Sequence, residues 1–137
     1  MDKKTDAYVD TSAFISFADR SDTHHDLFLR AFADPPRLIT SSLVVAEGHG
    51  WFLRRFGSFR ALQFIAMMDS IEPLEVIAFG PAELPEAVSM LKKFNDQTLT
   101  LADAFGLSLM ARRRVSSCWS TDFHLGLTGV PLLIHER

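Results

Sequence analysis

Two aspartates stand where apolar segments of the chain end. Asp10 closes the short apolar run Ala7–Asp10, and Asp122 follows the run Val115–Ser120 through Thr121. Ligands of open parallel sheets gather at the carboxyl ends of strands, so both acids are candidate site residues. Each also has a local alternative, because Asp is common as a helix cap and as a turn-forming residue.

Two further acids lie inside helical stretches. Glu47 interrupts a nearly continuous apolar segment with Gly48 and Gly50 close by, and a carboxylate there is desolvated unless a positive charge meets it. A solvent-facing side chain is the alternative for Glu47. Asp103 stands three residues after Thr100, as the acid of a capping box does, and the helix that follows is largely apolar. Its alternatives are a cap and a ligand near the core.

Together the four acids indicate a cation site. Two stand at strand ends and two in the first half of helices that pack beside those ends. Converging carboxylates cannot all stay ionised unless a cation shares the site. The ligand set is oxygen only, which favours Mg²⁺ or Mn²⁺ as the cofactor. Such a centre is typical of phosphoryl transfer.

The elements that must position these acids alternate between strands and helices. The predicted strands are Ala7–Asp10, Arg37–Thr40, Leu74–Phe79, Val115–Ser120 and Pro131–His135. The predicted helices are Ser12–Ala18, Thr23–Ala33, Ser42–Phe56, Phe59–Asp69, Gly80 to about Phe94, and Thr100–Arg114. This order predicts an α/β fold, a three-layer α/β/α sandwich with a central parallel sheet of about five strands, formed by residues 1–137 as one domain.

Composition narrows the class of protein. The chain has 137 residues, 47% of them hydrophobic, which excludes a disordered protein. Fourteen Lys and Arg against 17 Asp and Glu give a net charge of −3, unlike a polybasic binder. Cys118 is the only cysteine, and no apolar run approaches the length of a membrane span. We therefore expect a cytoplasmic protein without a membrane partner.

Four motifs resemble those of a known family. They read Tyr-Val-Asp-Thr-Ser-Ala at 8–13, Thr-Ser-Ser-Leu-Val-Val-Ala-Glu at 40–47, Leu-Thr-Leu-Ala-Asp-Ala at 99–104, and Ser-Thr-Asp-Phe at 120–123. In order and spacing they resemble the PIN domain, and within that group the VapC-type ribonuclease toxins. The resemblance covers nearly the whole chain and implies a single PIN-like nuclease domain.

The resemblance also assigns roles to residues. It implies that the acidic metal site consists of Asp10, Glu47, Asp103 and Asp122. By the same similarity Ser12 and Thr121 are supporting hydroxyl residues, and Asp96 is an additional acid.

The implied activity is metal-dependent endonucleolytic cleavage of RNA by a metal-activated water. Its implied partners are the RNA substrate, a cognate antitoxin protein and a second copy in a homodimer. A housekeeping RNA-processing PIN nuclease and a non-catalytic PIN-like RNA-binding scaffold are the alternatives. A haloacid-dehalogenase-type phosphatase is disfavoured, because Ser12 stands where it needs a second Asp and no Lys follows Lys93.

Other residues bear on substrate and partner. Candidate contacts to RNA phosphates are Arg54, Arg55, Arg112 and Arg113, with solvated helix ends as the alternative. His49 and Trp51 after Glu47, and His124 after Asp122, depart from the usual pattern and bear on substrate preference. Seven phenylalanines indicate either an apolar surface for a partner protein or simply the hydrophobic core. They are Phe14, Phe17, Phe28, Phe32, Phe52, Phe56 and Phe59.

Overall fold

The computed structural model describes residues 6–136. Four strands alternate with six α-helices and two short 3₁₀ helices in this part of the chain. In order these are β1 (Ala7–Val9), α1 (Thr11–Ala18), α2 (His25–Ala33), β2 (Leu38–Ser41), α3 (Ser42–Phe56), α4 (Ser58–Ser70), β3 (Leu74–Ile77), α5 (Leu84–Lys93), α6 (Leu101–Arg113), β4 (Ser117–Trp119), η1 (Phe123–Gly126) and η2 (Leu133–His135).

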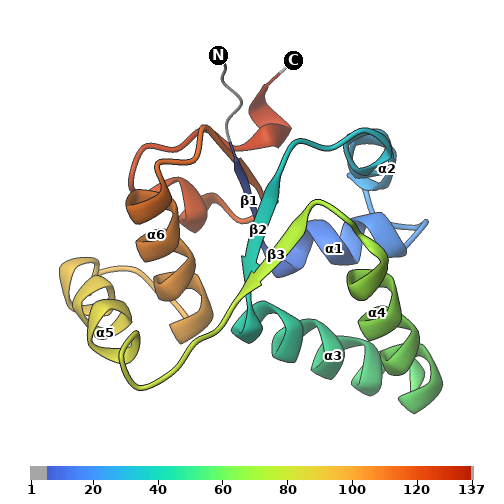
Figure 1. The fold of residues 1–137 in the computed structure, drawn as a ribbon, viewed down its shortest axis with the longest axis horizontal. Helices are drawn as coiled ribbons and strands as arrows, with labels where there is room; N and C mark the ends of the chain where they lie inside the picture. Colours follow the sequence, from blue (N-terminus) through green and yellow to red (C-terminus); the bar gives the residue numbers. More distant parts are fainter. Residues whose placement is uncertain (1–5, 137) are drawn as a thin grey trace.

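The strands form one parallel sheet in the order β3-β2-β1-β4. Because every strand runs the same way, their carboxyl ends meet at one edge, and the loops that carry Asp10 and Asp122 leave from it. Figure 1 shows α5 and α6 on one side of the sheet and α1 to α4 on the other. The predicted three-layer α/β/α arrangement is therefore confirmed.

Strand β1 and helix α6 form the centre of the hydrophobic core. All three residues of β1 are buried, and in α6 every residue from Ala104 to Met110 is buried, so this helix is covered on all sides. Asp103 and Thr100 sit at its first turn, next to the carboxyl edge of the sheet.

None of the helices in the described part of the chain is long and apolar enough to cross a membrane.

The last predicted strand, Pro131–His135, is reduced to a single bridge. Leu132 pairs in parallel with Cys118, and the backbone N–H of His135 then bonds to the carbonyl of Leu132 over 3.0 Å. That bond turns the chain into η2 after one ladder position. Among residues 6–136 the sheet has four strands and this one bridge.

The start of α5 also differs from the prediction. The chain makes turns at 81–83 and the helix begins at Leu84, not at Gly80. The side chain of Glu83 accepts a hydrogen bond from the backbone N–H of Gly80 over 2.9 Å, which closes a local turn. Pro85 then lies in the first turn of the helix, where its missing N–H costs nothing.

The phenylalanines divide between core and surface. Phe14, Phe28 and Phe52 are buried, and Phe17 and Phe32 are partly buried against the same core, so the core alternative holds for these five. Phe56 and Phe59 lie at the junction of α3 and α4 with exposed fractions of 49% and 71%. Any apolar surface from this set is therefore at that junction and not on the first two helices.

Candidate active site

Asp10 is the most buried acid at the carboxyl edge of the sheet. Its exposed fraction is 6%, and it occupies the N-cap position of α1 without making a side-chain capping hydrogen bond. Instead its Oδ2 accepts hydrogen bonds from the hydroxyls of Ser12 and Ser120, both over 3.0 Å. The capping alternative for Asp10 is therefore not observed.

The same two hydroxyls connect Asp10 to the loop after β4. The backbone N–H of Thr121 donates to Oγ of Ser12, and that of Asp122 donates to Oγ of Ser120, each over 2.9 Å. Each serine hydroxyl thus accepts a hydrogen bond from the backbone of this loop and donates one to Asp10. These bonds fix the position of Asp122 relative to Asp10. Thr121 takes part through its backbone.

Glu47 lies in the second turn of α3, half-buried. Helix α3 begins directly at the end of β2, where Oγ of Ser41 caps it by accepting from the N–H of Val44 over 3.3 Å. Oε1 of Glu47 accepts a hydrogen bond from the hydroxyl of Thr11 over 2.8 Å. A solvent-facing Glu47 is therefore not what the structure shows.

Asp103 forms the capping box that its spacing predicts. Its N–H donates to Oγ1 of Thr100 over 3.0 Å, and its Oδ2 accepts from the N–H of Thr100 over 3.1 Å. These bonds occupy one carboxylate oxygen and hold the side chain at the first turn of α6. The cap and a place in the acidic site coexist in this residue.

Asp122 caps η1 and binds a histidine. Its Oδ1 accepts from the backbone N–H of His124 over 3.0 Å and lies 2.8 Å from Nδ1 of the same residue. The ring of Phe123 stacks on that of His124 at 4.2 Å. Among residues 6–136, this imidazole is the only group able to carry a positive charge that lies within ion-pair distance of one of the four acids.

Burial and the charge of a neighbouring carboxylate raise the pKa values of three of these acids. Desolvation, followed by the negative charge of Asp103, raises the pKa of Asp10 to about 6. Partial burial and the charge of Asp103 also raise the pKa of Glu47. Burial and the charge of Asp122 raise the pKa of Asp103, which the hydrogen bond to Thr100 partly opposes. The four acids form one electrostatically coupled cluster that is short of positive charge.

This cluster fits a hard divalent cation in charge and in donor type. Its ligating atoms are carboxylate and hydroxyl oxygens, which Mg²⁺ and Mn²⁺ prefer. A cation would also relieve the repulsion that raises these pKa values. Within the described residues no three acidic, histidine or cysteine side chains converge closely enough to hold an ion.

Asp96 lies apart from this cluster. It is exposed in the turn between α5 and α6, and it makes no hydrogen bond or ion pair with any other residue the structure describes. Two residues that the sequence patterns did not single out, Ser120 and Thr11, instead contact the acids directly. Both are hydroxyl residues adjacent in sequence to a motif acid or its neighbour, which is the signal that identifies them.

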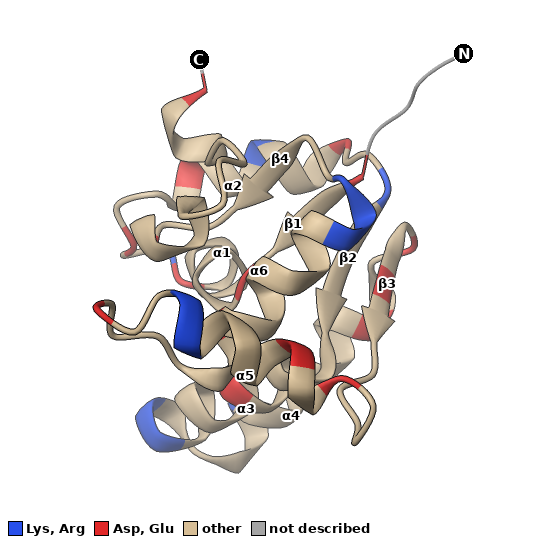
Figure 2. Cartoon of the chain, turned by 90° about the vertical axis from the view of Figure 1, so that its left-hand side faces the viewer, with Lys and Arg blue, Asp and Glu red and all other residues tan. Residues whose placement is uncertain are grey.

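The predicted arginines fall into two groups. Arg112 pairs with Glu86 over 3.6 Å at the end of α6. Arg113 pairs with Asp6 and Glu75 over 3.2 Å and 3.3 Å. This end of α6 is about 15 Å along the helix from Asp103, and Figure 2 shows it beside the beginning of β1. The structure does not bring Arg112 and Arg113 to the acids.

Arg54 and Arg55 are closer to the acids, on α3. Arg54 lines a pocket of about 370 Å³ that also includes Glu47 and Trp51. The guanidinium of Arg55 lies over the ring of Trp51, 4.8 Å from its centroid. The pocket opens directly beside the acidic cluster.

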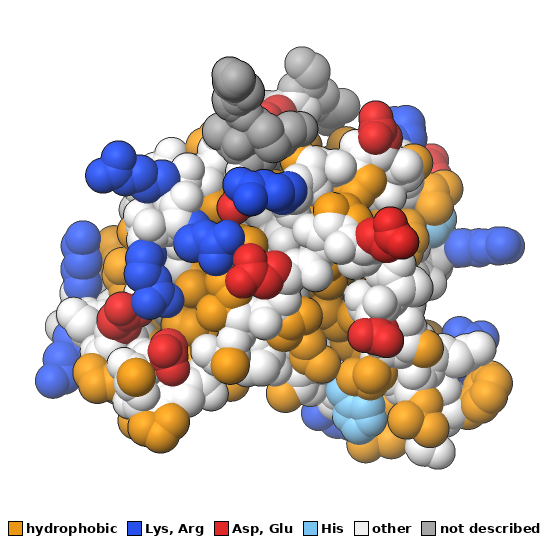
Figure 3. Space-filling view, viewed as in Figure 1, with side chains coloured by type: hydrophobic (Ala, Val, Ile, Leu, Met, Phe, Trp, Pro, Cys, Tyr) orange, Lys and Arg blue, Asp and Glu red, His pale blue; other side chains and the backbone are white. Residues whose placement is uncertain are grey.

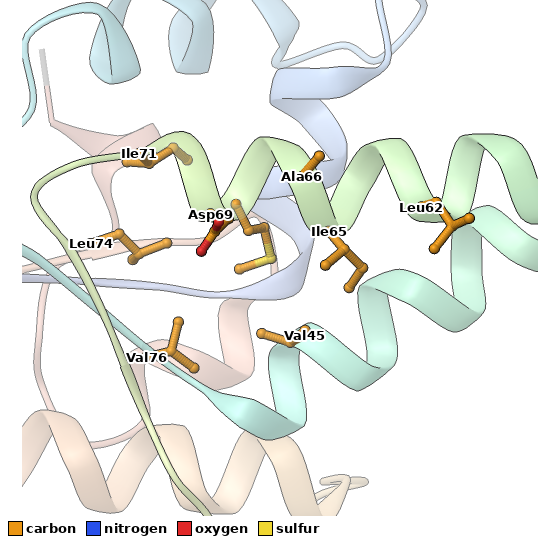
Figure 4. A pocket seen from close by; sticks show the side chains of 9 residues that line it. Val45, Leu62, Ile65, Ala66, Asp69, Ile71, Leu74 and Val76 are labelled. Atoms are coloured by element: carbon orange, nitrogen blue, oxygen red, sulfur yellow. The ribbon is translucent and has the colours of Figure 1, made fainter.

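A second pocket lies between β3, α3 and α4. Its volume is about 380 Å³, and Figure 4 shows Asp69 as the one charged side chain among apolar ones such as Ile65 and Val76. In Figure 3, which faces β3, hydrophobic side chains reach the surface between acidic ones. Without converging polar groups this groove is no candidate for catalysis.

Comparisons with known proteins agree with this fold. Residues 7–125 match the PIN domain family. VapC20 of Mycobacterium tuberculosis, a sarcin–ricin loop cleaving toxin, superposes with a TM-score of 0.81 at 22% identity, covering 90% of this chain and 95% of that one. A toxin–antitoxin complex from Klebsiella pneumoniae superposes with a TM-score of 0.62 at 16% identity, covering 92% and 94%. No curated protein sequence gives a significant match.

Proposed function

We propose that this chain, which belongs to the PIN domain family, is a metal-dependent endoribonuclease and the toxin of a type II toxin–antitoxin pair. The observation that carries the proposal is the state of Asp10. It is a buried carboxylate whose pKa is raised to about 6, because burial and repulsion by the negative charge of Asp103 both disfavour its ionised form. Burial of such a carboxylate lowers the stability of the fold, and carboxylates with strongly raised pKa values are typical of sites that bind a cation or catalyse a reaction.

The solved structures with the same fold support the choice of substrate and partner. One is described as a toxin that cleaves the sarcin–ricin loop, an RNA element, and the other as a toxin–antitoxin complex. We extend both properties to this chain, as an RNA substrate and a protein antitoxin met in the cytoplasm, and we also expect a homodimer.

The ligands of Mg²⁺ or Mn²⁺ in this proposal are Asp10, Asp103 and Asp122, with Glu47 beside them. When bound there, the metal supplies Lewis-acid polarisation of a phosphate oxygen and a water of lowered pKa. Ser12 and Ser120 orient the carboxylate of Asp10 and favour its ionised form, because they donate to it.

Glu47 is the residue that positions water in this proposal. The hydroxyl of Thr11 fixes Oε1, so the other carboxylate oxygen is left for a water molecule or a second metal. Raised basicity through partial burial suits a group that accepts a proton from that water. The capping box holds Asp103 at the first turn of α6, from where its charge acts on Glu47.

Cleavage assays on total RNA test the proposal with a matched pair of acids. We expect EDTA to abolish cleavage, Mn²⁺ or Mg²⁺ to restore it, and Asp10→Asn to remove it. Asp96→Asn is the control, because it deletes the same charge from an exposed acid outside the cluster. Full activity of the Asp10 variant, or full activity in EDTA, would refute the proposed chemistry.

The antitoxin is tested by co-expression with a short neighbouring open reading frame. The exposed rings of Phe56 and Phe59 offer apolar surface for such a protein. We expect a stable complex in which cleavage is inhibited, and a dimer of the free toxin by light scattering. A monomer at tens of micromolar that binds no neighbouring gene product contradicts both partner proposals.

A further inference from the structure

The pocket beside Glu47 has a lining that the proposed metal chemistry leaves unexplained. It lies between the first residue of α1 and the outer face of α3. Its lining residues are Thr11, Ala46, Glu47, Gly50, Trp51 and Arg54. Its volume of about 370 Å³ is near the lower end of the roughly 300–1,000 Å³ typical of ligand sites, which suits one nucleotide.

Three of these residues form a stripe along α3. Glu47, Trp51 and Arg54 are separated by four and three positions, so they share one face of the helix. The stripe begins at the acidic cluster and places an aromatic ring and then a cation about 10 Å along the helix. A carboxylate, a ring and a cation in this order form a path for a strand that leaves the cleavage site.

Trp51 is held in place while part of it stays accessible. Its ring meets that of Phe52 edge-on at 4.9 Å, and the guanidinium of Arg55 lies over it at 4.8 Å. These contacts restrict the ring, so little side-chain entropy is lost when a ligand packs on its open surface. Unpaired RNA bases are recognised by stacking on such aromatic side chains.

Among the described residues, no acid forms an ion pair with Arg54, and its side chain is exposed. A methyl group on Gly50 would lie 3.2 Å from Nη1 of Arg54, so the glycine lets the guanidinium lie close to the helix at the pocket. In contrast, Arg112 and Arg113 both pair with carboxylates. Arg54 is therefore free for a phosphate.

We propose that this pocket binds one unpaired nucleotide of the RNA next to the cleaved phosphate, with its base against Trp51 and its phosphate on Arg54. The proposal rests on the proposed ribonuclease function and deepens it. It makes Trp51 and Arg54 determinants of which single-stranded sites are cut. Neither residue belongs to the acidic cluster, so both can be changed without removing a metal ligand.

Binding of unstructured RNA hexamers tests this, in an Asp10→Asn background that does not cleave them. We expect Trp51→Ala to weaken binding roughly 5- to 150-fold, the range for loss of one base–aromatic stack, and Trp51→Phe to retain most of it. Arg54→Gln should lower the salt dependence, the slope of log K against log salt, by about 0.7, as for one lost phosphate contact. Arg60→Gln is the control, because Arg60 lies over Phe56 outside the pocket.

Tryptophan fluorescence gives a second readout that does not depend on cleavage. The chain has two tryptophans, and Trp119 is only 4% exposed, so RNA quenching should report Trp51. We expect the hexamers to quench the fluorescence of the Asp10→Asn protein and to leave Trp51→Phe in that background unchanged. Arg54→Gln, a change at an exposed position, remains informative if Trp51→Ala loosens its packing with Phe52.

The outcomes separate this inference from the proposed function. If wild-type protein cleaves RNA but Trp51→Ala and Arg54→Gln leave affinity and salt slope unchanged, the nucleotide pocket is refuted and the ribonuclease stands. If wild-type protein neither cleaves nor binds RNA, the proposed function fails first. If these variants lose affinity for the antitoxin alone, the pocket is a protein contact, which also overturns the inference.

Discussion

The hydroxyl of Thr11 donates to Oε1 of Glu47 over 2.8 Å, which joins the first residue of α1 to the second turn of α3. The two residues are 36 positions apart, and the bond exists because β1 and β2 are neighbours whose carboxyl ends meet. It sets the orientation of a half-buried carboxylate beside the acidic cluster and opposes the rise of its pKa. Thr11 is thus a positioning residue for Glu47.

Thr11→Val should therefore slow RNA cleavage while leaving the fold intact. Valine has the same shape without the hydroxyl, so the pKa of Glu47 rises further and its carboxylate loses one restraint. We expect cleavage to fall about 10-fold or more, a loss of about 1 kcal/mol in the free energy of unfolding, and a shift of the acid limb of the pH–rate profile to higher pH. Thr11→Ser should restore all three. A rate loss with an unmoved pH profile would argue against action through Glu47.

Asp103 allows its two roles to be separated by two substitutions. Asn keeps an oxygen that accepts from the N–H of Thr100, so Asp103→Asn should retain the cap and the fold while abolishing cleavage. Asp103→Ala should abolish cleavage and also cost about 1 kcal/mol of stability, because the capping box is lost. Urea denaturation beside RNA cleavage measures both effects. Normal cleavage by the Asn variant would leave Asp103 as a cap only.

The burial of Asp10 predicts an unusual pH dependence of stability without metal. Its pKa is about 6 in the folded protein against 3.8 for the free group, so between these values the folded state binds more protons than the unfolded state. The free energy of unfolding therefore falls as pH rises from about 4 to 6, by an amount on the order of 3 kcal/mol from this group.

Asp10→Asn removes this titration. In EDTA at pH 7 we expect the variant to be more stable than the wild type by about 1–3 kcal/mol, with the difference shrinking toward pH 4. Glu47 and Asp103 titrate in the same direction in both proteins, so the difference between the two curves comes from Asp10 and from its charge acting on Asp103. Urea denaturation across this pH range measures it. A difference that stays constant with pH contradicts the assigned cause.

The sequence predicted the frame of the site because that frame depends on local patterns. The apolar runs ending at Asp10 and before Thr121 are strands, and the spacing of Thr100 and Asp103 is the capping box that forms. Hydrophobic periodicity and capping chemistry act within a few residues, so one sequence is enough to read them.

Contacts between segments that are far apart in the chain could not be predicted from the sequence. Ser120 and Asp10 are 110 residues apart, and their bond requires β1 and β4 to be adjacent in the sheet. Similarly, Arg113 ends α6 at the opposite edge of the sheet, where β1 begins, and there it pairs with Asp6. The single bridge at Leu132 follows from a backbone turn that alternation of apolar residues does not reveal.

Divalent metal should stabilise the folded chain through the acidic cluster. A cation that binds only the folded state adds about 2.7 kcal/mol at 100 times its dissociation constant, roughly 3–7 °C in melting temperature for a domain of this size. We expect Mn²⁺ to raise the melting temperature of the wild type and of Asp96→Asn equally, and to have little effect on Asp122→Asn. An equal response from all three would place the bound metal elsewhere.

The two glycines after Glu47 should respond oppositely to alanine. A methyl group on Gly48 would lie 2.2 Å from Cζ of Phe64, a ring buried between α3 and α4, whereas one on Gly50 meets only the flexible end of Arg54 at 3.2 Å. Overpacking typically costs 1–3 kcal/mol, and alanine regains about 1 kcal/mol of helix propensity. We therefore expect Gly48→Ala to destabilise by up to about 2 kcal/mol and Gly50→Ala to be neutral or stabilising in urea denaturation. Adding Phe64→Leu should relieve the first, and an undiminished loss in that double variant would mean that the helix contact is not its cause.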